Sequence, residues 1–392
     1  MIDAMLLKSC RYIVTQNPAR DILEGYDIRV EGGSIKEIGK GLSGEGVDCS
    51  NRIVMPGLIN LHGHYGMHLL KGVCDDEQLM QWLGIVMPKE QELRDDNKLS
   101  ESAKIACEEM LLTGTTTIAD GYWPMEPLIA AVDKSGIRAV FFTVLDELKK
   151  IKFEHPRITW GVAAHSIYHT SLDDLQKAHA YATEHDIFKT IHIAETRKER
   201  FDSQKKFGKL PVEYLEEIGW LDGNTLLAHA VWVTKGEIKI LKKHDVKVAH
   251  CPISNMKLAS GGVMPLPEMK EEGVCVGLGT DSVVSNNNLD MFEEMKVTGL
   301  LHKHHRWDAR TAPQQYILDM ATINGAKCLG MEDSIGSLEV GKKADIITLN
   351  VDSPRLKPIN NVLSTVIYSA QGGDVSEVLV DGKLLVRDGK WE

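Results

Sequence analysis

Eight short apolar segments that alternate with helical stretches are the feature that most limits how this chain can fold. We expect strands at residues 53–61, 115–119, 138–144, 159–163, 189–193, 225–228, 246–249 and 274–278. Between the first two, apolar residues recur with helical spacing at Ala103, Ala106, Cys107, Met110 and Leu111. Eight consecutive strand–helix units favour a closed parallel barrel over an open sheet. The sequence therefore predicts an α/β protein built on a (β/α)8 TIM-like barrel.

The two ends of the chain show a different pattern of short alternating strands and tight turns. Near the N-terminus, strands are expected at 27–30 and 35–38, on either side of a Gly32-Gly33 turn. Near the C-terminus they are expected at 344–349, 378–380 and 384–386, the last two joined by an Asp381-Gly382 turn. We expect the ends to meet in one small β-sandwich domain of residues 1–55 and 341–392, with residues 56–340 forming the barrel.

Composition excludes several classes of protein. Apolar residues make up 43% of the chain and charged residues 26%, as in a globular protein with a sizeable core. No apolar stretch approaches the ~20 residues that span a bilayer. The net charge of −11, with no long basic stripe, argues against nucleic acid and anionic membranes as partners. The seven scattered cysteines form no CxxC pair, so we expect reduced thiols and a cytoplasmic location.

Histidines gather where the predicted strands end. Five of the eight strand ends carry histidine and a sixth carries aspartate: His62 and His64, His165, His192, His229, His250, and Asp281. In (β/α)8 barrels the C-terminal strand ends meet at one mouth, where the reactive groups lie. His62 and His64 are two residues apart, so both imidazoles of an extended segment face the same space. A lone histidine is more often a core or capping residue, but this set is hard to explain that way.

We interpret the cluster as a metal site. Several neutral imidazoles and a carboxylate would be costly to bury together without a cation. Three nitrogen ligands and one oxygen ligand suit Zn²⁺, with Fe²⁺ as the alternative, and leave a position for water. We expect His62, His64, His192 and Asp281 to bind one ion. A two-metal site bridged by a modified lysine would need a lysine where His165 stands.

Glu195 admits two readings from the residues alone. If the strand ends near Ile193, the chain can turn and bring the Glu195 carboxylate to the metal-bound water. Alternatively, Glu195 is a surface carboxylate at the start of the helix that begins around Thr196. His302, His304 and His305 are expected to lie on a solvated helix face.

Four segments resemble one enzyme family. Residues 56–64, which end in His62-Gly63-His64, are similar to the first-strand signature of the amidohydrolase superfamily. Residues 192–196, 250–258 and 278–282 resemble its nucleoside-deaminase branch, and within it the methylthioadenosine/S-adenosylhomocysteine and 5′-deoxyadenosine deaminases. The resemblance extends over nearly the whole chain, including residues 336–345.

This resemblance implies a metal-dependent hydrolytic deaminase that converts an adenosine-type nucleoside to the inosine analogue and ammonia. It implies the same four metal ligands, with Glu195 as proton shuttle and His229 and Asp281 as further catalytic groups. Trp82 and Glu90 correspond to the ribose-binding segment, which is one residue shorter here, and His165 to a substrate-contacting histidine. The implied partner is a small-molecule substrate, and the implied assembly is a homo-oligomer.

The chain departs from the family between residues 146 and 157. Relatives usually carry a longer helix there, with arginines that reach toward the substrate, so we expect a small or neutral 5′ substituent. Guanine, a pterin, a pyrimidine or a chloro-triazine remain alternative substrates of the same site. A non-catalytic scaffold is a further alternative, although it predicts eroded ligands and all four are present. The spacing His192-x-x-Glu195 does not match the H-x-E motif of cytidine deaminases.

Overall fold

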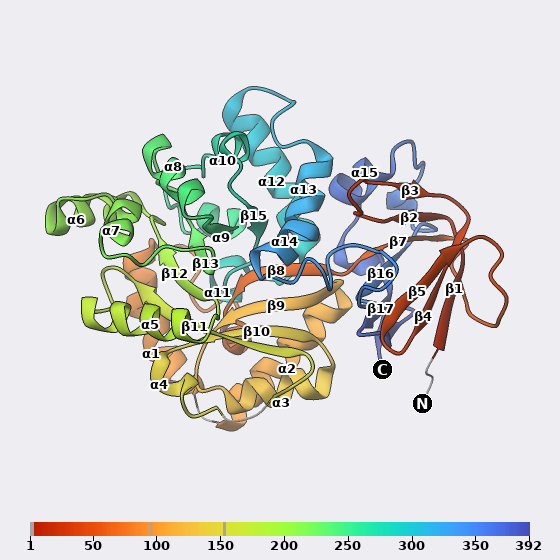
Figure 1. Cartoon of the computed structure of the whole chain (residues 1–392), viewed down its shortest axis with the longest axis horizontal. Coiled ribbons are helices and arrows are strands. Elements are labelled where there is room, and N and C mark those ends of the chain that lie inside the picture. The colour runs from red at the N-terminus through yellow and green to blue at the C-terminus, as the bar shows by residue number, and fades with distance from the viewer. Residues whose placement is uncertain (1–3, 95, 152–153) are drawn as a thin grey trace.

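The barrel consists of eight parallel strands that follow one another in chain order (Figure 1). The computed structural model describes residues 4–94, 96–151 and 154–392. The barrel strands are β8 (Leu58–Gly63), β9 (Thr115–Gly121), β10 (Arg138–Thr143), β11 (Ile158–Ser166), β12 (Lys189–Ile193), β13 (Thr225–His229), β14 (Lys247–His250) and β15 (Val276–Leu278). The first and last strands meet through a parallel bridge between Gly63 and Asp281. The Asp281 amide also donates to the His62 carbonyl at 2.8 Å, so the sheet comes close to full closure there.

The expected strand at 53–61 is wrong as a single element. The structure divides it into β7 (Arg52–Pro56), which belongs to another sheet, and β8 of the barrel. The chain passes between the two at Gly57, where a Cβ atom would lie 2.1 Å from Oγ1 of Thr116. Only glycine permits this close approach, so Pro56-Gly57 marks the crossing from one sheet to the other.

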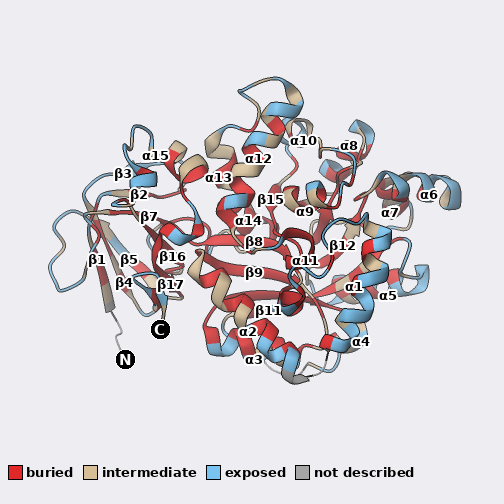
Figure 2. Cartoon of the chain, turned by 180° about the vertical axis from the view of Figure 1, so that it is seen from behind, coloured by how far each residue is buried: buried red, intermediate tan, exposed pale blue. Residues whose placement is uncertain are grey.

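Helices surround the barrel, and their exposed faces lie outside the buried strands (Figure 2). In chain order they are η1 (Tyr65–Leu70), α1 (Leu79–Leu93), α2 (Asp96–Leu112), α3 (Glu126–Ser135), α4 (Leu145–Leu148), α5 (Leu172–Glu184), α6 (Arg197–Phe207), α7 (Pro211–Glu217), α8 (Lys235–Lys243), α9 (Pro252–Lys257), α10 (Leu266–Glu272), α11 (Val283–Asn286), α12 (Met291–Arg306), α13 (Gln314–Ala321) and α14 (Ile323–Cys328). Local sequence fixes several ends. Ser171 and Thr196 accept backbone N–H groups at the starts of α5 and α6, and Gly208 ends α6 in the left-handed conformation.

Strands from both chain ends form two further sheets beside the barrel. One contains β1 (Ala4–Cys10), β4 (Tyr26–Glu31), β5 (Ser34–Gly39) and β6 (Val47–Asp48); the other contains β2 (Tyr12–Val14), β3 (Ile22–Leu23), β7, β16 (Ile346–Asn350), β17 (Val375–Val380), β18 (Lys383–Arg387) and β19 (Lys390–Trp391). The predicted turns are present: Gly32, Gly33, Asp381 and Gly382 all have positive φ. Buried side chains of both sheets pack into one cluster, among them Leu7, Ile28, Val54 and Leu379. Strands from both ends of the chain therefore share one core.

A buried ion pair joins the barrel to the sandwich. Arg138, at the start of β10, donates from Nε and Nη2 to the two carboxylate oxygens of Asp345 at 2.9 and 3.1 Å. Asp345 also accepts the Asp381 amide at 2.7 Å, which anchors the β17–β18 turn to the same carboxylate. Within the described residues, no helix is both long and apolar enough to cross a membrane.

Candidate functional site

A cavity of about 690 Å³ opens at the C-terminal ends of the barrel strands. Every site residue expected from the sequence lines it: His62, His64, Trp82, Glu90, His165, His192, Glu195, His229 and Asp281. They come from strands throughout the barrel: His62 lies on its first strand, β8, and Asp281 follows its last strand, β15. This volume is within the range of small-molecule sites.

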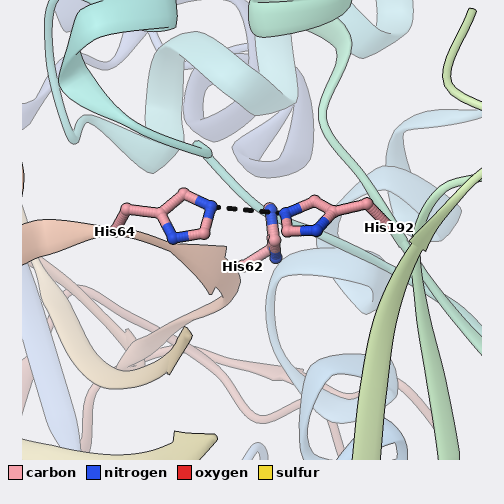
Figure 3. A group of neighbouring side chains, drawn as sticks. All are labelled: His62, His64 and His192. Carbon is pink, nitrogen blue, oxygen red and sulfur yellow. Dashed lines mark hydrogen bonds between the residues drawn. The ribbon is translucent and has the colours of Figure 1, made fainter. Parts of the chain in front are cut away.

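Three imidazoles and one carboxylate converge at the cavity floor. The His62, His64 and His192 rings face a common point, with His64 and His192 on either side of His62 (Figure 3). Asp281 Oδ1 lies 3.5 Å from His62 Nε2 and 3.4 Å from His64 Nε2. The Nε2 atoms of His64 and His192 are 3.4 Å apart. His62, His229 and Asp281 form a second group of equally close ligand atoms.

The other ring nitrogens explain why these groups need a cation. His64 Nδ1 lies 2.7 Å from the Gly121 carbonyl, and His192 Nδ1 lies 2.7 Å from the His165 carbonyl. A carbonyl oxygen only accepts, so both Nδ1 atoms carry the proton, and each neutral ring turns an Nε2 lone pair toward the common point. Burial lowers the pKa of His192 well below its usual value, which keeps that ring neutral.

An unpartnered atom supports the same conclusion. His62 Nε2 is buried and has no hydrogen-bond partner among the described residues. Lone pairs that face one another in a buried site repel unless a positive ion lies between them. The group therefore has the composition and spacing that a divalent metal ion requires. In two of its rings, the hydrogen bond from Nδ1 to a backbone carbonyl fixes the orientation of the ring.

Asp281 is held with one oxygen free. Ser254 donates to Asp281 Oδ2 at 2.6 Å and Ser285 donates to the same atom at 3.1 Å, which leaves Oδ1 facing the imidazoles. Burial raises the pKa of Asp281, but the close approach of the His62 ring outweighs burial and brings the pKa well below its usual value. The side chain is therefore a carboxylate, ready to act as an oxygen ligand.

Glu195 lies in the cavity and not on the surface. Its side chain is 5% exposed, and its Oε2 is 3.9 Å from His229 Nε2. Burial, and then the negative charge of Asp281, raise the pKa of Glu195 to about 8. A carboxyl group with this pKa exchanges protons readily near neutral pH, as a general acid or base must.

Glu199 anchors the backbone at Glu195, a role that the sequence analysis did not assign. Its Oε1 accepts the Ala194 amide at 2.9 Å and its Oε2 accepts the Glu195 amide at 3.0 Å. Burial raises the pKa of Glu199 to about 8 although both amides lower it. The spacing of Thr196 and Glu199, typical of a helix start, was the available signal.

His229 faces Glu195 at the end of β13. Its side chain is 1% exposed, and Asn255 donates to its Nδ1 at 3.1 Å. The proton of this neutral ring then lies on Nε2, the atom that faces the cavity. Burial lowers the pKa of His229, in agreement with a neutral ring.

The wall farther from the imidazoles contains a residue that the sequence analysis missed. Glu90 on α1 accepts a hydrogen bond from Arg94 Nη2 at 2.8 Å. The Arg94 guanidinium lies 4.8 Å from the ring centre of Trp123 and also lines the cavity. Trp82 lies about two turns earlier on the same helix. It is 7% exposed, and its Nε1 has no hydrogen-bond partner among the described residues. The i, i+4 spacing of Glu90 and Arg94 was the signal that could have indicated the pair.

One expectation about the histidines is wrong. His302 on α12 is buried, and its Nε2 lies 3.1 Å from Nε2 of His250, behind the barrel wall. His304 and His305 are exposed, as expected. Three closely spaced histidines at the end of a polar helix indicate a solvated face. The sequence could not show that His302 faces inward, because its partner, His250, lies on β14.

The shortened segment between residues 146 and 157 borders the cavity. Asp146 and Lys149 line it from this segment, and α5 adds Asp174 and Lys177. Residues 152 and 153 lie outside the described residues. Apolar side chains of α1 and α4 line the cavity beside them, including Leu83, Val86 and Leu145.

Comparison with known proteins agrees with this geometry. The model of the amidohydrolase family matches residues 53–385. A 5′-deoxyadenosine deaminase from Methanosphaera stadtmanae is 42% identical, over 94% of this chain and 92% of its own. A 5-methylthioadenosine/S-adenosylhomocysteine deaminase from Thermococcus sibiricus is 40% identical, over 92% and 89%.

Solved structures share the fold. An adenosine deaminase from Xanthomonas campestris with bound zinc is 30% identical and covers 99% of this chain and 94% of its own, with a TM-score of 0.95. The atrazine chlorohydrolase of Arthrobacter aurescens, complexed with zinc, is 24% identical and covers 99% and 96%, with a TM-score of 0.92. At that identity it shows the fold alone. Since the family model spans most of the chain and the relatives align over nearly its full length, this protein belongs to the amidohydrolase family.

Proposed function

We propose that this protein is a metal-dependent hydrolase that deaminates an adenosine-type nucleoside. The observation that carries the proposal is the cavity floor, where three imidazoles and Asp281 converge beside the buried carboxyl group of Glu195. The similarity to 5′-deoxyadenosine and methylthioadenosine/S-adenosylhomocysteine deaminases supports this choice of substrate. Water would replace the amino group at C6 of adenine, forming a C–O bond and breaking the C–N bond to release ammonia.

His62, His64, His192 and Asp281 would hold one ion, for which we propose Zn²⁺ with Fe²⁺ as the alternative. Such an ion lowers the pKa of water to ~7 and so provides a nucleophile at neutral pH. The zinc in the adenosine deaminase from Xanthomonas campestris supports this choice. Elemental analysis of the purified protein tests it: one zinc or iron per chain is expected, and loss of any one of the four ligands should reduce that content.

Glu195 would transfer protons, and His229 would position the attacking oxygen. The Glu195 carboxylate takes a proton from the attacking water and delivers it to the ring nitrogen beside C6, so that the adenine ring accepts the incoming electron pair. His229 Nε2 donates a hydrogen bond to the attacking oxygen and fixes its position above C6. Asp281 would then accept the remaining proton of that oxygen and pass it to the amino group, which leaves as ammonia.

Trp82 and Glu90 would hold the sugar. Glu90 can accept hydrogen bonds from ribose hydroxyls, while Trp82 presents an aromatic surface and an unpartnered N–H group. Arg94 donates a hydrogen bond that orients the Glu90 carboxylate. Loss of one ribose hydroxyl from the substrate should therefore raise KM in the wild type and have a smaller effect in Glu90→Gln.

We further propose a small or neutral 5′ substituent, a homo-oligomer and a cytoplasmic location. The apolar side chains of Leu83, Val86 and Leu145 along the cavity support the first. The seven free cysteines of the chain support a reducing compartment. Light scattering at several protein concentrations tests the assembly.

An ammonia-release assay of the zinc-loaded protein tests the activity. The panel consists of adenosine, 5′-deoxyadenosine, methylthioadenosine, S-adenosylhomocysteine, guanine and cytosine, with a chloro-triazine followed by chloride release. We expect ammonia from the adenosine-type nucleosides, fastest from those with a small 5′ group. Turnover confined to guanine, cytosine or the triazine would reject the proposal in favour of another member of the same reaction class.

A further inference from the structure

Two cysteines lie side by side at the end of the barrel opposite the active-site mouth. Cys275 immediately precedes β15, and Cys328 is the last residue of α14. Their Sγ atoms are 3.6 Å apart. Each sulfur also faces a backbone carbonyl, Cys275 that of Asn324 at 3.8 Å and Cys328 that of Cys275 at 4.0 Å. A disulfide has an S–S distance of about 2.05 Å, so the two sulfurs would have to approach each other by about 1.5 Å to form one.

One of the two thiols is reachable from outside. Cys275 lines a cavity of about 380 Å³ that is separate from the active site, together with Lys247, Lys327, Asp245 and Glu332. Cys275 is partly exposed, whereas Cys328 is buried behind it. This arrangement differs from a pair of core thiols, because a small oxidant can enter the cavity and reach the first sulfur directly.

The surroundings of Cys275 favour its thiolate form. The hydrogen bond from Cys328 lowers the pKa of Cys275 most; burial opposes this, and the positive charges of Lys327 and Lys247 lower it further. The thiolate is the reactive form of cysteine toward peroxides. Cys328, by contrast, has its pKa raised well above the usual value, first by burial.

We propose that Cys275 and Cys328 form a reversible oxidation site that reacts with hydroperoxides and closes to a disulfide. The Cys275 thiolate attacks one oxygen of hydrogen peroxide, the O–O bond breaks, and the thiol becomes a sulfenic acid while the second oxygen leaves as water after taking up a proton. The Cys328 thiol then attacks the Cys275 sulfur, and the sulfenic oxygen leaves as a second water. Two thiols are oxidised by two electrons and one peroxide is reduced. A dithiol reductant reverses the reaction.

The disulfide would fasten β15 to α14. β15 is the short strand that leads to Asp281, so the bond would hold the last barrel strand at the end away from the metal ligands. This site does not depend on the proposed deaminase activity, since none of its residues lines the active-site cavity.

A second cysteine pair in the same chain provides a matched control. Cys10 ends β1 and Cys49 precedes β7, and both are fully buried in the sandwich core. The two thiols are hydrogen-bonded neighbours, and this bond raises the pKa of Cys10. Neither lines one of the two cavities described above. Proximity without access from either cavity should leave this pair reduced.

The experiment treats the zinc-loaded full-length protein with hydrogen peroxide under native conditions. Remaining thiols are alkylated, and the digested protein is analysed by mass spectrometry before and after dithiothreitol. We expect five of the seven thiols to remain, a peptide cross-linked through Cys275 and Cys328, and full recovery on reduction. In Cys328→Ser, a sulfenic acid probe such as dimedone should label Cys275, whereas in Cys275→Ser it should leave Cys328 unlabelled. Lys327→Met should slow the loss of thiols several-fold.

Three results would overturn the proposal. The first is retention of all seven thiols at a peroxide concentration that oxidises a small free thiol. The second is a Cys10–Cys49 cross-link that forms as fast as the Cys275–Cys328 one. The third is dimedone labelling of Cys328 and not Cys275 in the single-serine variants.

Discussion

Several residues of the site are held in a backbone conformation that side chains rarely adopt. Ala194, His229 and Asp281 have φ values of 48°, 71° and 61°. Each such residue costs on the order of 1 kcal/mol relative to the right-handed conformation, so the surrounding contacts must impose it. The conformation turns the chain at the strand ends and brings Glu195, His229 and Asp281 into the cavity. Sequence periodicity alone would have placed Glu195 on the face opposite His192.

Glu195→Gln should separate proton transfer from metal binding. The amide has nearly the same shape but cannot carry the proton from water to the ring, so kcat should fall by about 10²–10⁴ while the metal content stays at the wild-type level. The measurements are ammonia release and elemental analysis of the same sample. Turnover within a few-fold of the wild type would remove Glu195 from the mechanism.

The two buried glutamates should make the metal-free protein less stable as the pH rises. Glu195 and Glu199 have pKa values of about 8 in the folded chain, against an ordinary value of 4.5. The folded state therefore keeps protons that the unfolded state releases, and stability is lost as the pH rises toward 8. The buried histidines have lowered pKa values in the folded chain, but above about pH 7.5 they are largely neutral in the unfolded state too and no longer offset this loss.

Between pH 7.5 and 9, the free energy of unfolding of the chelated protein should fall by roughly 1 kcal/mol per carboxyl group. Urea titrations at several pH values measure it, and Glu195→Gln should show a shallower slope. An equal slope in the variant would contradict a raised pKa at Glu195.

At the scale of elements, local sequence signals located most strands and several of the site residues. The barrel strands were predictable because each is a short apolar run bounded by polar turns, and the parallel order places their histidines at one mouth. The break between β7 and β8 at Gly57 could not be predicted, because the apolar run continues across it. The residue that requires glycine there, Thr116, lies on the next strand. Likewise, the burial of His302 depends on His250 of another element.

The contribution of α1 can be tested at Arg94. Its side chain joins Glu90 on the same helix to the ring of Trp123 after β9. Arg94→Ala should leave Glu90 without its partner and loosen the wall of the cavity, raising KM for the nucleoside about 10-fold with a smaller change in kcat. Steady-state kinetics with adenosine-type substrates measures KM and kcat separately.

Arg94→Lys is the informative second variant. It keeps the charge but loses the planar group that lies over Trp123. Its KM should therefore lie between those of Arg94→Ala and the wild type. A loss confined to kcat, with KM unchanged in both variants, would show that Arg94 does not act through substrate binding.

At the scale of the whole molecule, the barrel and the sandwich depend on each other through Arg138 and Asp345. Arg138→Met should leave the Asp345 carboxylate buried without its cation and lower the free energy of unfolding by about 3–5 kcal/mol. Urea unfolding measures the change. Arg310→Met is the matched control, because Arg310 and Asp308 form an exposed pair and the same substitution should cost less than about 1 kcal/mol. Equal effects of the two substitutions would contradict a structural role for the buried pair.

The place where the barrel closes has a consequence for how the protein matures. The Gly63–Asp281 bridge lies beside the proposed metal ligands, so the first and the last of these residues in the sequence come together only when the first and last strands pair. During synthesis, the growing chain cannot offer a complete coordination sphere until the ribosome has released residue 281. Binding of the proposed ion would then be a late step, and a fully translated chain deprived of the metal should be less stable where these two strands pair.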